Sequence, residues 1–173
     1  MTTIAAEEVR DIFVTGLRNA HAMEKQALSI MEPQLERIDN YPDIARRLED
    51  HIRETHGQIE RLETIMDGLG ESASGLKDMA MSVAGSMAAM GHTIAGDEIL
   101  KNSLANFAFE NYELAAYSSL VTLAEAGGYA EAKRGLMQSL DEEQAMAEWI
   151  GSNLPGVTLR FVKLRQAGEQ ASH

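Results

Sequence analysis

Four glutamates lie within apolar helical stripes, a position from which glutamate is usually excluded. Glu24 and Glu143 each continue a series of apolar residues spaced by three and four, and Glu110 and Glu113 do so within one further segment. Because residues at this spacing share one face of a helix, the carboxylates point toward a protein interior. Buried carboxylates repel one another and take up protons unless positive charge is near. Metal cations bridged by the carboxylates would supply that charge. The pattern therefore predicts a metal site.

A fifth carboxylate comes from the segment between that of Glu24 and that of Glu110. Glu54 flanks the apolar stripe of its helix, in a polar line with His51 and Gln58. Glu24 and Glu54 are 30 residues apart, and so are Glu113 and Glu143. An internally duplicated helix pair would bring these four side chains to one level, around an approximate two-fold axis.

The predicted metal ligands are Glu24, Glu54, Glu110, Glu113 and Glu143. Gln58, His51 and Tyr117 are candidates for additional ligands or for side chains that hold the ligands in place. Tyr117 is expected to pack in the core with its hydroxyl hydrogen-bonded rather than to act in redox chemistry. The alternative is a polar seam, in which the glutamates are hydrogen-bonded to neighbouring side chains or reach solvent.

Four long segments carry the 3.6-residue apolar period that positions these groups. The expected helices run from residue 6 to 38, from Pro42 to a stop at 68–70, from 96–97 to a stop at 127–128, and from 129 to 154. A short helix within the methionine-rich residues 72–92 would connect the two halves, and a short C-terminal helix, 159–166, would precede a frayed tail. Two helices, a long connection and two more helices predict an all-α, ferritin-like four-helix bundle with one crossover, as a single domain over residues 1–173.

Composition excludes several classes of function. The 173-residue chain has a net charge of −12, so it offers no basic surface to nucleic acid or to an anionic membrane. It has no cysteine, which excludes disulfides, iron–sulfur clusters and thiol nucleophiles. With neither a secretory signal nor a membrane-spanning stretch in view, a cytoplasmic location is expected.

The chain also resembles the YciE/YciF family of ferritin-like bacterial proteins over nearly its whole length. The resemblance is carried by residues 22–28, 54–62, 109–117, 122–129 and 140–144, including Glu-Thr-x-x-Gln-x-x-Arg-Leu-Glu from Glu54 and Leu-Ala-Glu-x-x-Gly-Tyr from Leu123. It implies a ferritin-like fold, a homodimer and a stress-related role without an agreed enzymatic activity. The metal-facing positions that it implies are Glu24, Glu54, Gln58, Glu110, Glu113 and Glu143.

Two positions depart from that family pattern. Members often have histidine where Gln58 stands and aspartate where Ala147 stands. The glutamate-x-x-histidine motif of many ferritin-like sites is also absent, because Gly57 follows Glu54 by three residues and Met146 follows Glu143 by three. These departures leave three alternatives open: a site that binds metal more weakly, a site that binds a single ion, or a vestigial site.

Two functions from different classes follow. The first is a metal-binding protein that holds one or two iron ions, or manganese, and oxidises ferrous iron or consumes peroxide. The second is a non-enzymatic, dimeric structural or interaction protein with an empty metal site. The sequence leaves open whether the chain is an enzyme.

Overall fold

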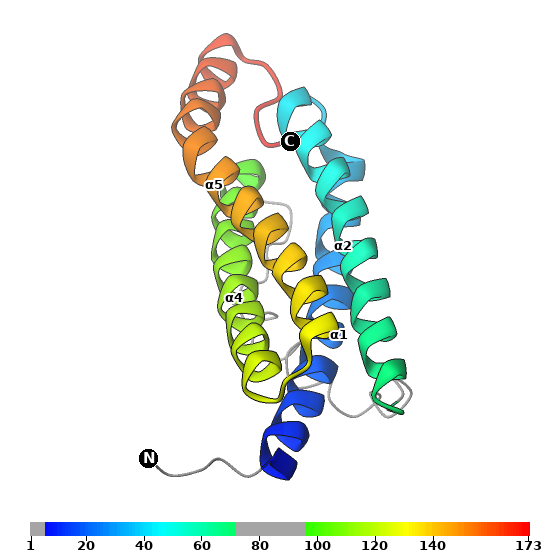
Figure 1. Cartoon of the computed structure of the whole chain (residues 1–173). Helices are drawn as coiled ribbons and strands as arrows, with labels where there is room; N and C mark the ends of the chain where they lie inside the picture. The colour runs from blue at the N-terminus through cyan, green and yellow to red at the C-terminus, as the bar shows by residue number, and fades with distance from the viewer. Residues whose placement is uncertain (1–5, 72–95) are drawn as a thin grey trace.

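Four helices make up the computed structural model, which describes residues 6–71 and 96–173. They are α1 (Ala6–Arg37), α2 (Pro42–Gly68), α4 (Glu98–Ala126) and α5 (Ala130–Ala167). They lie side by side with α1 packed against α2 and α4, and α5 packed against α4 and α2 (Figure 1). The predicted all-α bundle is confirmed. The expected connecting helix, residues 72–92, lies outside the described residues.

Short turns make α1 antiparallel to α2, and α4 antiparallel to α5 (Figure 1). Pro42 begins α2, where its missing N–H costs no helical hydrogen bond. The turn between α4 and α5 uses Gly127 and Gly128, the latter at φ +73°. A Cβ at Gly127 would come within 2.3 Å of the Tyr129 ring, which stacks on Phe13 of α1 at 5.0 Å between centroids. This turn therefore needs glycine at both positions, and it closes one end of the bundle with an aromatic pair.

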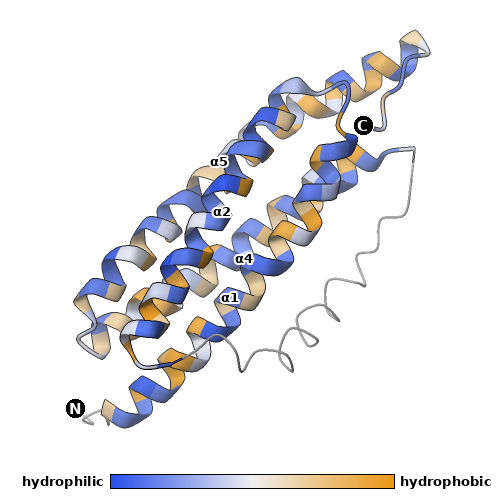
Figure 2. Cartoon of the chain, turned by 90° about the vertical axis from the view of Figure 1, so that its right-hand side faces the viewer, coloured by the Kyte–Doolittle hydropathy of each residue, from blue (hydrophilic) through white to orange (hydrophobic). Residues whose placement is uncertain are grey.

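Apolar residues fill the bundle along most of its length. Hydrophobic and hydrophilic residues are mixed along each of the four helices (Figure 2). Phe13, Leu17 and Leu62 are completely buried. Gly16 lets α1 and α4 approach closely, because a Cβ there would lie 2.8 Å from a methyl carbon of Leu120. The apolar layers thus enclose the middle of the bundle, where the glutamates lie.

The predicted end of the fourth helix at residue 154, just before Pro155, is wrong. Residues 130–167 form one helix that continues through Pro155, so the separate C-terminal helix over 159–166 does not exist. The reason is local: Pro155 removes one hydrogen bond to the carbonyl of Gly151, and because both residues are exposed, water can satisfy that carbonyl. Pro33 is likewise exposed within α1, which continues to Arg37.

The tail after α5 is docked rather than frayed. Gly168, at φ +72°, ends the helix, and the chain then turns back toward the start of α2 (Figure 1). Tyr41 donates its hydroxyl hydrogen bond to the carbonyl of Ala171 at 2.7 Å, and the backbone N–H of Ile99 donates to the carbonyl of Ser172 at 2.7 Å. The tail therefore ties the α1–α2 turn to the beginning of α4.

In the described part of the chain, none of the helices is both long and apolar enough to cross a bilayer.

We expect Tyr41→Phe to lower the melting temperature by about 2–4 °C, because it removes one buried hydrogen bond worth roughly 1 kcal/mol. Thermal unfolding followed by circular dichroism measures this. Thr158→Val is the control, since Thr158 is exposed and its hydroxyl bonds only to the carbonyl of Leu154 in its own helix, so the melting temperature should not change. Equal melting temperatures for all three proteins would show that the tail does not stabilise the bundle.

Candidate metal centre

Polar side chains from all four helices meet in the middle of the bundle. They are Glu24 of α1, His51 and Gln58 of α2, Glu110, Glu113 and Tyr117 of α4, and Glu143 of α5. None is more than 2% exposed. A packed layer of this kind contains little water, so its charges interact strongly.

Four of these side chains converge on one point. His51, Glu110, Glu113 and Glu143 each offer a ligand atom, and these atoms all lie within 4.8 Å of one another. Nε2 of His51 lies 3.2 Å from Oε2 of Glu110 and 3.7 Å from Oε2 of Glu143. One imidazole nitrogen and three carboxylates from three helices are a ligand set suited to iron or manganese.

Glu24 lies beside this group rather than within it. Its Oε1 accepts a hydrogen bond from the Tyr117 hydroxyl at 2.6 Å, and its Oε2 has no hydrogen-bond partner. Burial raises the pKa of Glu24 to about 7, although the Tyr117 hydrogen bond acts in the opposite direction. Tyr117 is completely buried with its hydroxyl bonded, as the sequence predicts.

Ligand atoms without partners are concentrated in this layer. Both carboxylate oxygens of Glu113 lack a hydrogen bond, as do Oε2 of Glu110, Oε2 of Glu143 and Nε2 of His51, whose approach to Glu110 lacks hydrogen-bond alignment. Buried polar atoms are almost always hydrogen-bonded in folded proteins. A metal cation would satisfy all of these atoms at once, and carboxylate oxygen and imidazole nitrogen are donors that such cations accept. The residues present therefore fit a metal.

The ionisation of the layer is strongly coupled. Burial and the neighbouring carboxylates raise the pKa of Glu113 well above its usual range. Burial and the other glutamates also raise the pKa of Glu143, against the attraction of His51. Burial lowers the pKa of His51, but its contacts with Glu110 and Glu54 outweigh this effect and raise the pKa to about 10. Without a metal, the layer thus favours the protonated forms of Glu113 and Glu143 and the charged form of His51.

Glu54, which the sequence predicts as a ligand, lies outside the converging group. Its side chain is 32% exposed, and its Oε2 is 2.9 Å from Nδ1 of His51. The same oxygen accepts a hydrogen bond from Arg47 at 2.9 Å. The hydrogen bonds with His51 and Arg47 outweigh partial burial and lower the pKa of Glu54. Glu54 therefore fixes the orientation of the His51 ring, which leaves Nε2 facing the carboxylates.

Gln58 also supports a ligand. Its amide nitrogen donates to Oε1 of Glu143 and to Oε2 of Glu142, the second at 3.2 Å. Its Oε1 is buried without a partner. The nitrogen lone pair of an amide does not bind metal, so the present arrangement holds Glu143 in place through the N–H donors.

Sequence reasoning missed Glu142. The charge run 141–143 predicts a solvated side chain there, but the Glu142 side chain is only 20% exposed and forms an ion pair with Arg61. A signal existed: Arg61 follows Gln58 by three residues, so both lie on one face of α2 and can reach neighbouring positions on a facing helix. His21 lies one turn before Glu24, but its Nε2 contacts Oε1 of Glu63 at 2.8 Å rather than the metal centre.

We predict that Glu113→Gln raises the melting temperature of metal-free protein at pH 8 by several degrees, since about 1 kcal/mol corresponds to roughly 2–4 °C in a domain of this size. The pKa of Glu113 is raised on folding, so its contribution to stability is intact below the unfolded pKa and is lost as pH rises through the folded pKa. The Gln substitution removes that loss. The difference in melting temperature between the variant and the wild type should therefore shrink toward pH 5. Calorimetry in a chelating buffer measures it.

Glu36→Gln is the control for this substitution, because Glu36 is an exposed glutamate of α1. A Glu113→Gln protein that is less stable than the wild type at pH 8 would show that the carboxylate is compensated within the folded chain itself.

Comparisons with known proteins identify the family and the fold of the chain. Residues 8–163 match the model of a family described as a domain of unknown function, DUF892. Protein YciF of Escherichia coli K12 is 32% identical over 147 residues, which cover 79% of this chain and 84% of YciF.

Two solved structures share the fold. A Xanthomonas campestris protein superposes with a TM-score of 0.77 at 28% identity, over 92% of this chain and 99% of its own. The crystal structure of YciF, described as a stress protein of E. coli, superposes with a TM-score of 0.66 over 84% of this chain and 94% of its own. Over that superposition the identity is 23%, so it supports the fold alone. With the family match spanning most of its length, the chain is a member of the DUF892 family and a relative of YciF.

Proposed function

We propose that this protein binds iron at the centre formed by His51, Glu110, Glu113 and Glu143, with Glu24 at its edge. The observation that supports this most strongly is the group of unpartnered ligand atoms, above all the two free oxygens of Glu113. A folded chain tolerates so costly a layer where it serves a function. Manganese(II) would accept the same donors.

Ferrous iron is the proposed substrate as well as the bound ion. Two ferrous ions give up one electron each to a hydrogen peroxide molecule, which takes up two protons and leaves as two waters, while both ions become ferric. The bound metal supplies the electrons. The carboxylates stabilise the higher charge of the ferric product, and a dry layer keeps that electrostatic effect large.

The surrounding residues have separate tasks in this proposal. Glu54 holds His51, Gln58 holds Glu143, and Tyr117 holds Glu24. Acids with raised pKa values release their protons when a cation binds, so metal affinity increases with pH.

The outer face of α4 favours a second candidate function, in which the protein acts as a homodimer. Between Lys101 and Glu125 the only charged residues of α4 are Glu110 and Glu113, and both are buried. The exposed residues of this segment form one helix face. They are Leu104, Phe107, Ala108, Asn111, Tyr112, Ala115, Ser118, Ser119 and Thr122.

A second copy of the chain suits this face better than an unlike partner of opposite charge. Two chains of net charge −12 repel each other, so a contact surface with few charges favours their association. Lys101 and Glu125 lie equally far along α4 from Glu113. An antiparallel, two-fold pairing of two α4 helices would place Lys101 of each chain opposite Glu125 of the other, and Leu104 and Phe107 opposite Thr122 and Ser119.

We expect protein purified without an affinity tag to bind one or two ferrous ions per chain in anaerobic titration calorimetry. Glu113→Gln/Glu143→Gln removes two ligands and should abolish this binding, whereas Glu36→Gln should not affect it. Glu54→Gln should keep the stoichiometry and weaken the affinity about 10–100-fold, because it disturbs a ligand without removing one. Unaltered binding in the double variant would exclude this centre.

For the dimer, we expect light scattering after size-exclusion chromatography to give twice the mass of one chain. Ser118→Arg buries a charge in the proposed contact and should give a monomer. Ser152→Arg, on the exposed side of α5, should remain a dimer. A wild-type monomer, or a dimeric Ser118→Arg protein, would rule out this interface.

A further inference from the structure

A groove of about 780 Å³ lies on the surface between α2 and α5, directly outside the metal centre. Its lining combines three acids and three bases with small and aromatic residues: Asp50, Glu54, Glu142, Arg47, Arg53, Arg61, Gly57, Ala145 and Trp149. The helices α2 and α5 contact each other less extensively than α1 and α2, α1 and α4, or α4 and α5 do. Gly57 and Ala145 add little side-chain volume, so the groove comes close to the interior.

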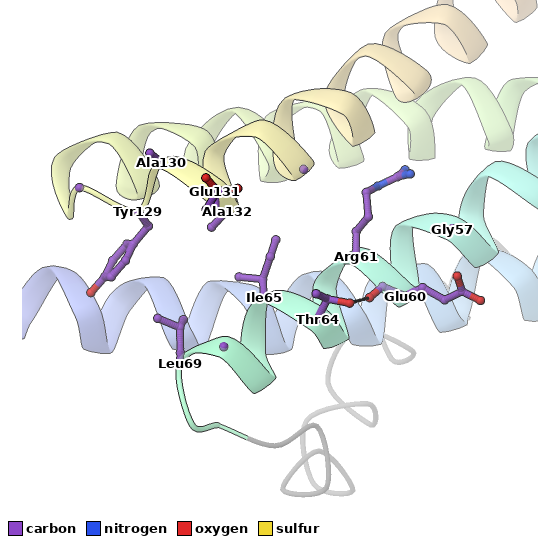
Figure 3. A pocket seen from close by; sticks show the side chains of 13 residues that line it. Gly57, Glu60, Arg61, Thr64, Ile65, Leu69, Tyr129, Ala130, Glu131 and Ala132 are labelled. Carbon is purple, nitrogen blue, oxygen red and sulfur yellow. Dashed lines mark hydrogen bonds between the residues drawn. The ribbon is translucent and has the colours of Figure 1, made fainter.

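This groove is distinct from a larger and more apolar one farther along the same two helices. The larger groove lies between the end of α2 and the start of α5 and is lined by Ile65, Leu69 and Tyr129 (Figure 3). Arg61 borders both grooves and extends from α2 toward α5 (Figure 3). Only the groove beside Glu54 and Glu142 has carboxylates that connect to the centre.

Each wall of the groove is linked to the centre through a single buried side chain. On the α5 side, Gln58 donates one hydrogen bond to Glu142 at the surface and another to Glu143 in the interior. On the α2 side, Glu54 contacts Nδ1 of His51, whose Nε2 faces Glu110. Glu142 and Glu143 are therefore joined by one amide group.

Apolar contacts close the bundle at three other places within the described residues. Gly16 and Leu120 bring α1 and α4 into close contact. The stacked rings of Phe13 and Tyr129 close one end. Toward the opposite end, the cavity between Leu48, Met146 and Ile150 is only about 30 Å³ and is mostly apolar. A hydrated cation would lose its water against each of these surfaces without gaining an oxygen ligand.

We propose that cations enter the centre through the groove between α2 and α5, with Glu142 as their first protein ligand and Gln58 as the side chain that lets them pass. This proposal rests on metal binding at the centre. Glu142 is paired with Arg61 in this structure, so an arriving cation must displace that guanidinium to use the carboxylate as a hard oxygen ligand. Glu143 is the next carboxylate inward.

Gln58 can change from a barrier to a ligand by rotating its terminal amide. In the present orientation its N–H donors face both carboxylates and Oε1 is unpartnered. Rotation by half a turn would place Oε1 against the two carboxylates, which is unfavourable unless a cation lies between the three groups. The rotation is therefore coupled to the arrival of the cation.

Trp149 provides a direct measurement of entry. It is the only tryptophan in the chain and it lines the groove, so binding of paramagnetic Mn²⁺ should quench its fluorescence. The experiment mixes metal-free protein with MnCl₂ in a stopped-flow instrument and separately measures the Mn²⁺ bound at equilibrium by metal analysis.

We expect Glu142→Gln and Gly57→Leu each to slow loading at least tenfold while the bound Mn²⁺ at equilibrium stays unchanged. The first removes the entry carboxylate, and the second fills the groove; a Cβ at Gly57 makes only an ordinary contact, at 3.5 Å from Arg61. The matched controls are Glu148→Gln, an exposed glutamate of the same helix, and Gly156→Leu, where nothing lies within 4 Å. Both controls should load at the wild-type rate.

The outcomes separate the two proposals. If the wild type binds Mn²⁺ but both variants load as fast as it does, this entry route is wrong and the metal centre stands. If either variant loses bound Mn²⁺ at equilibrium, its residue belongs to the binding site rather than to the route, which also overturns the proposal. If the wild type binds neither Mn²⁺ nor Fe²⁺, the metal centre itself fails.

Discussion

Electrostatic repulsion among buried carboxylates is the constraint on which the rest of this structure depends. Glu24, Glu110, Glu113 and Glu143 share a layer in which none is more than 2% exposed. Among the described residues, His51 is the one buried base in contact with these acids. Each acid gives up its hydration on burial, and each raises the cost of ionising its neighbours. The layer is therefore stable only with protons or with a bound cation.

The remaining structure confines this layer and orients its groups. Apolar residues and close helix contacts surround it, while Tyr117, Glu54 and Gln58 each hold one of the converging side chains. The docked tail and the two-glycine turn stabilise opposite ends of the bundle. Stability thus comes from the apolar layers and the ends, and the middle is left free to carry groups that lower it.

The helices and the inward glutamates could be predicted from the sequence because both depend on local periodicity. Apolar spacing alone identifies the helices, and it also places Glu24 and Glu143 inward. The choice between His51 and Glu54 could not be made in this way, since both flank the same stripe on α2. Arg47 and the facing carboxylates decide it by holding Glu54 outward and attracting the ring inward. The path of α5 through Pro155 and the docking of the tail likewise depend on solvent exposure and on partners far apart in the sequence.

A crystal grown at pH 7.5 and soaked in Mn²⁺ tests the central claim most directly, because anomalous scattering locates the ion itself. The account predicts one or two anomalous peaks enclosed by Nε2 of His51 and the carboxylates of Glu110, Glu113 and Glu143. It would be contradicted by a fully soaked crystal in which those carboxylates are hydrogen-bonded to one another or to water and the anomalous peaks lie only on the surface.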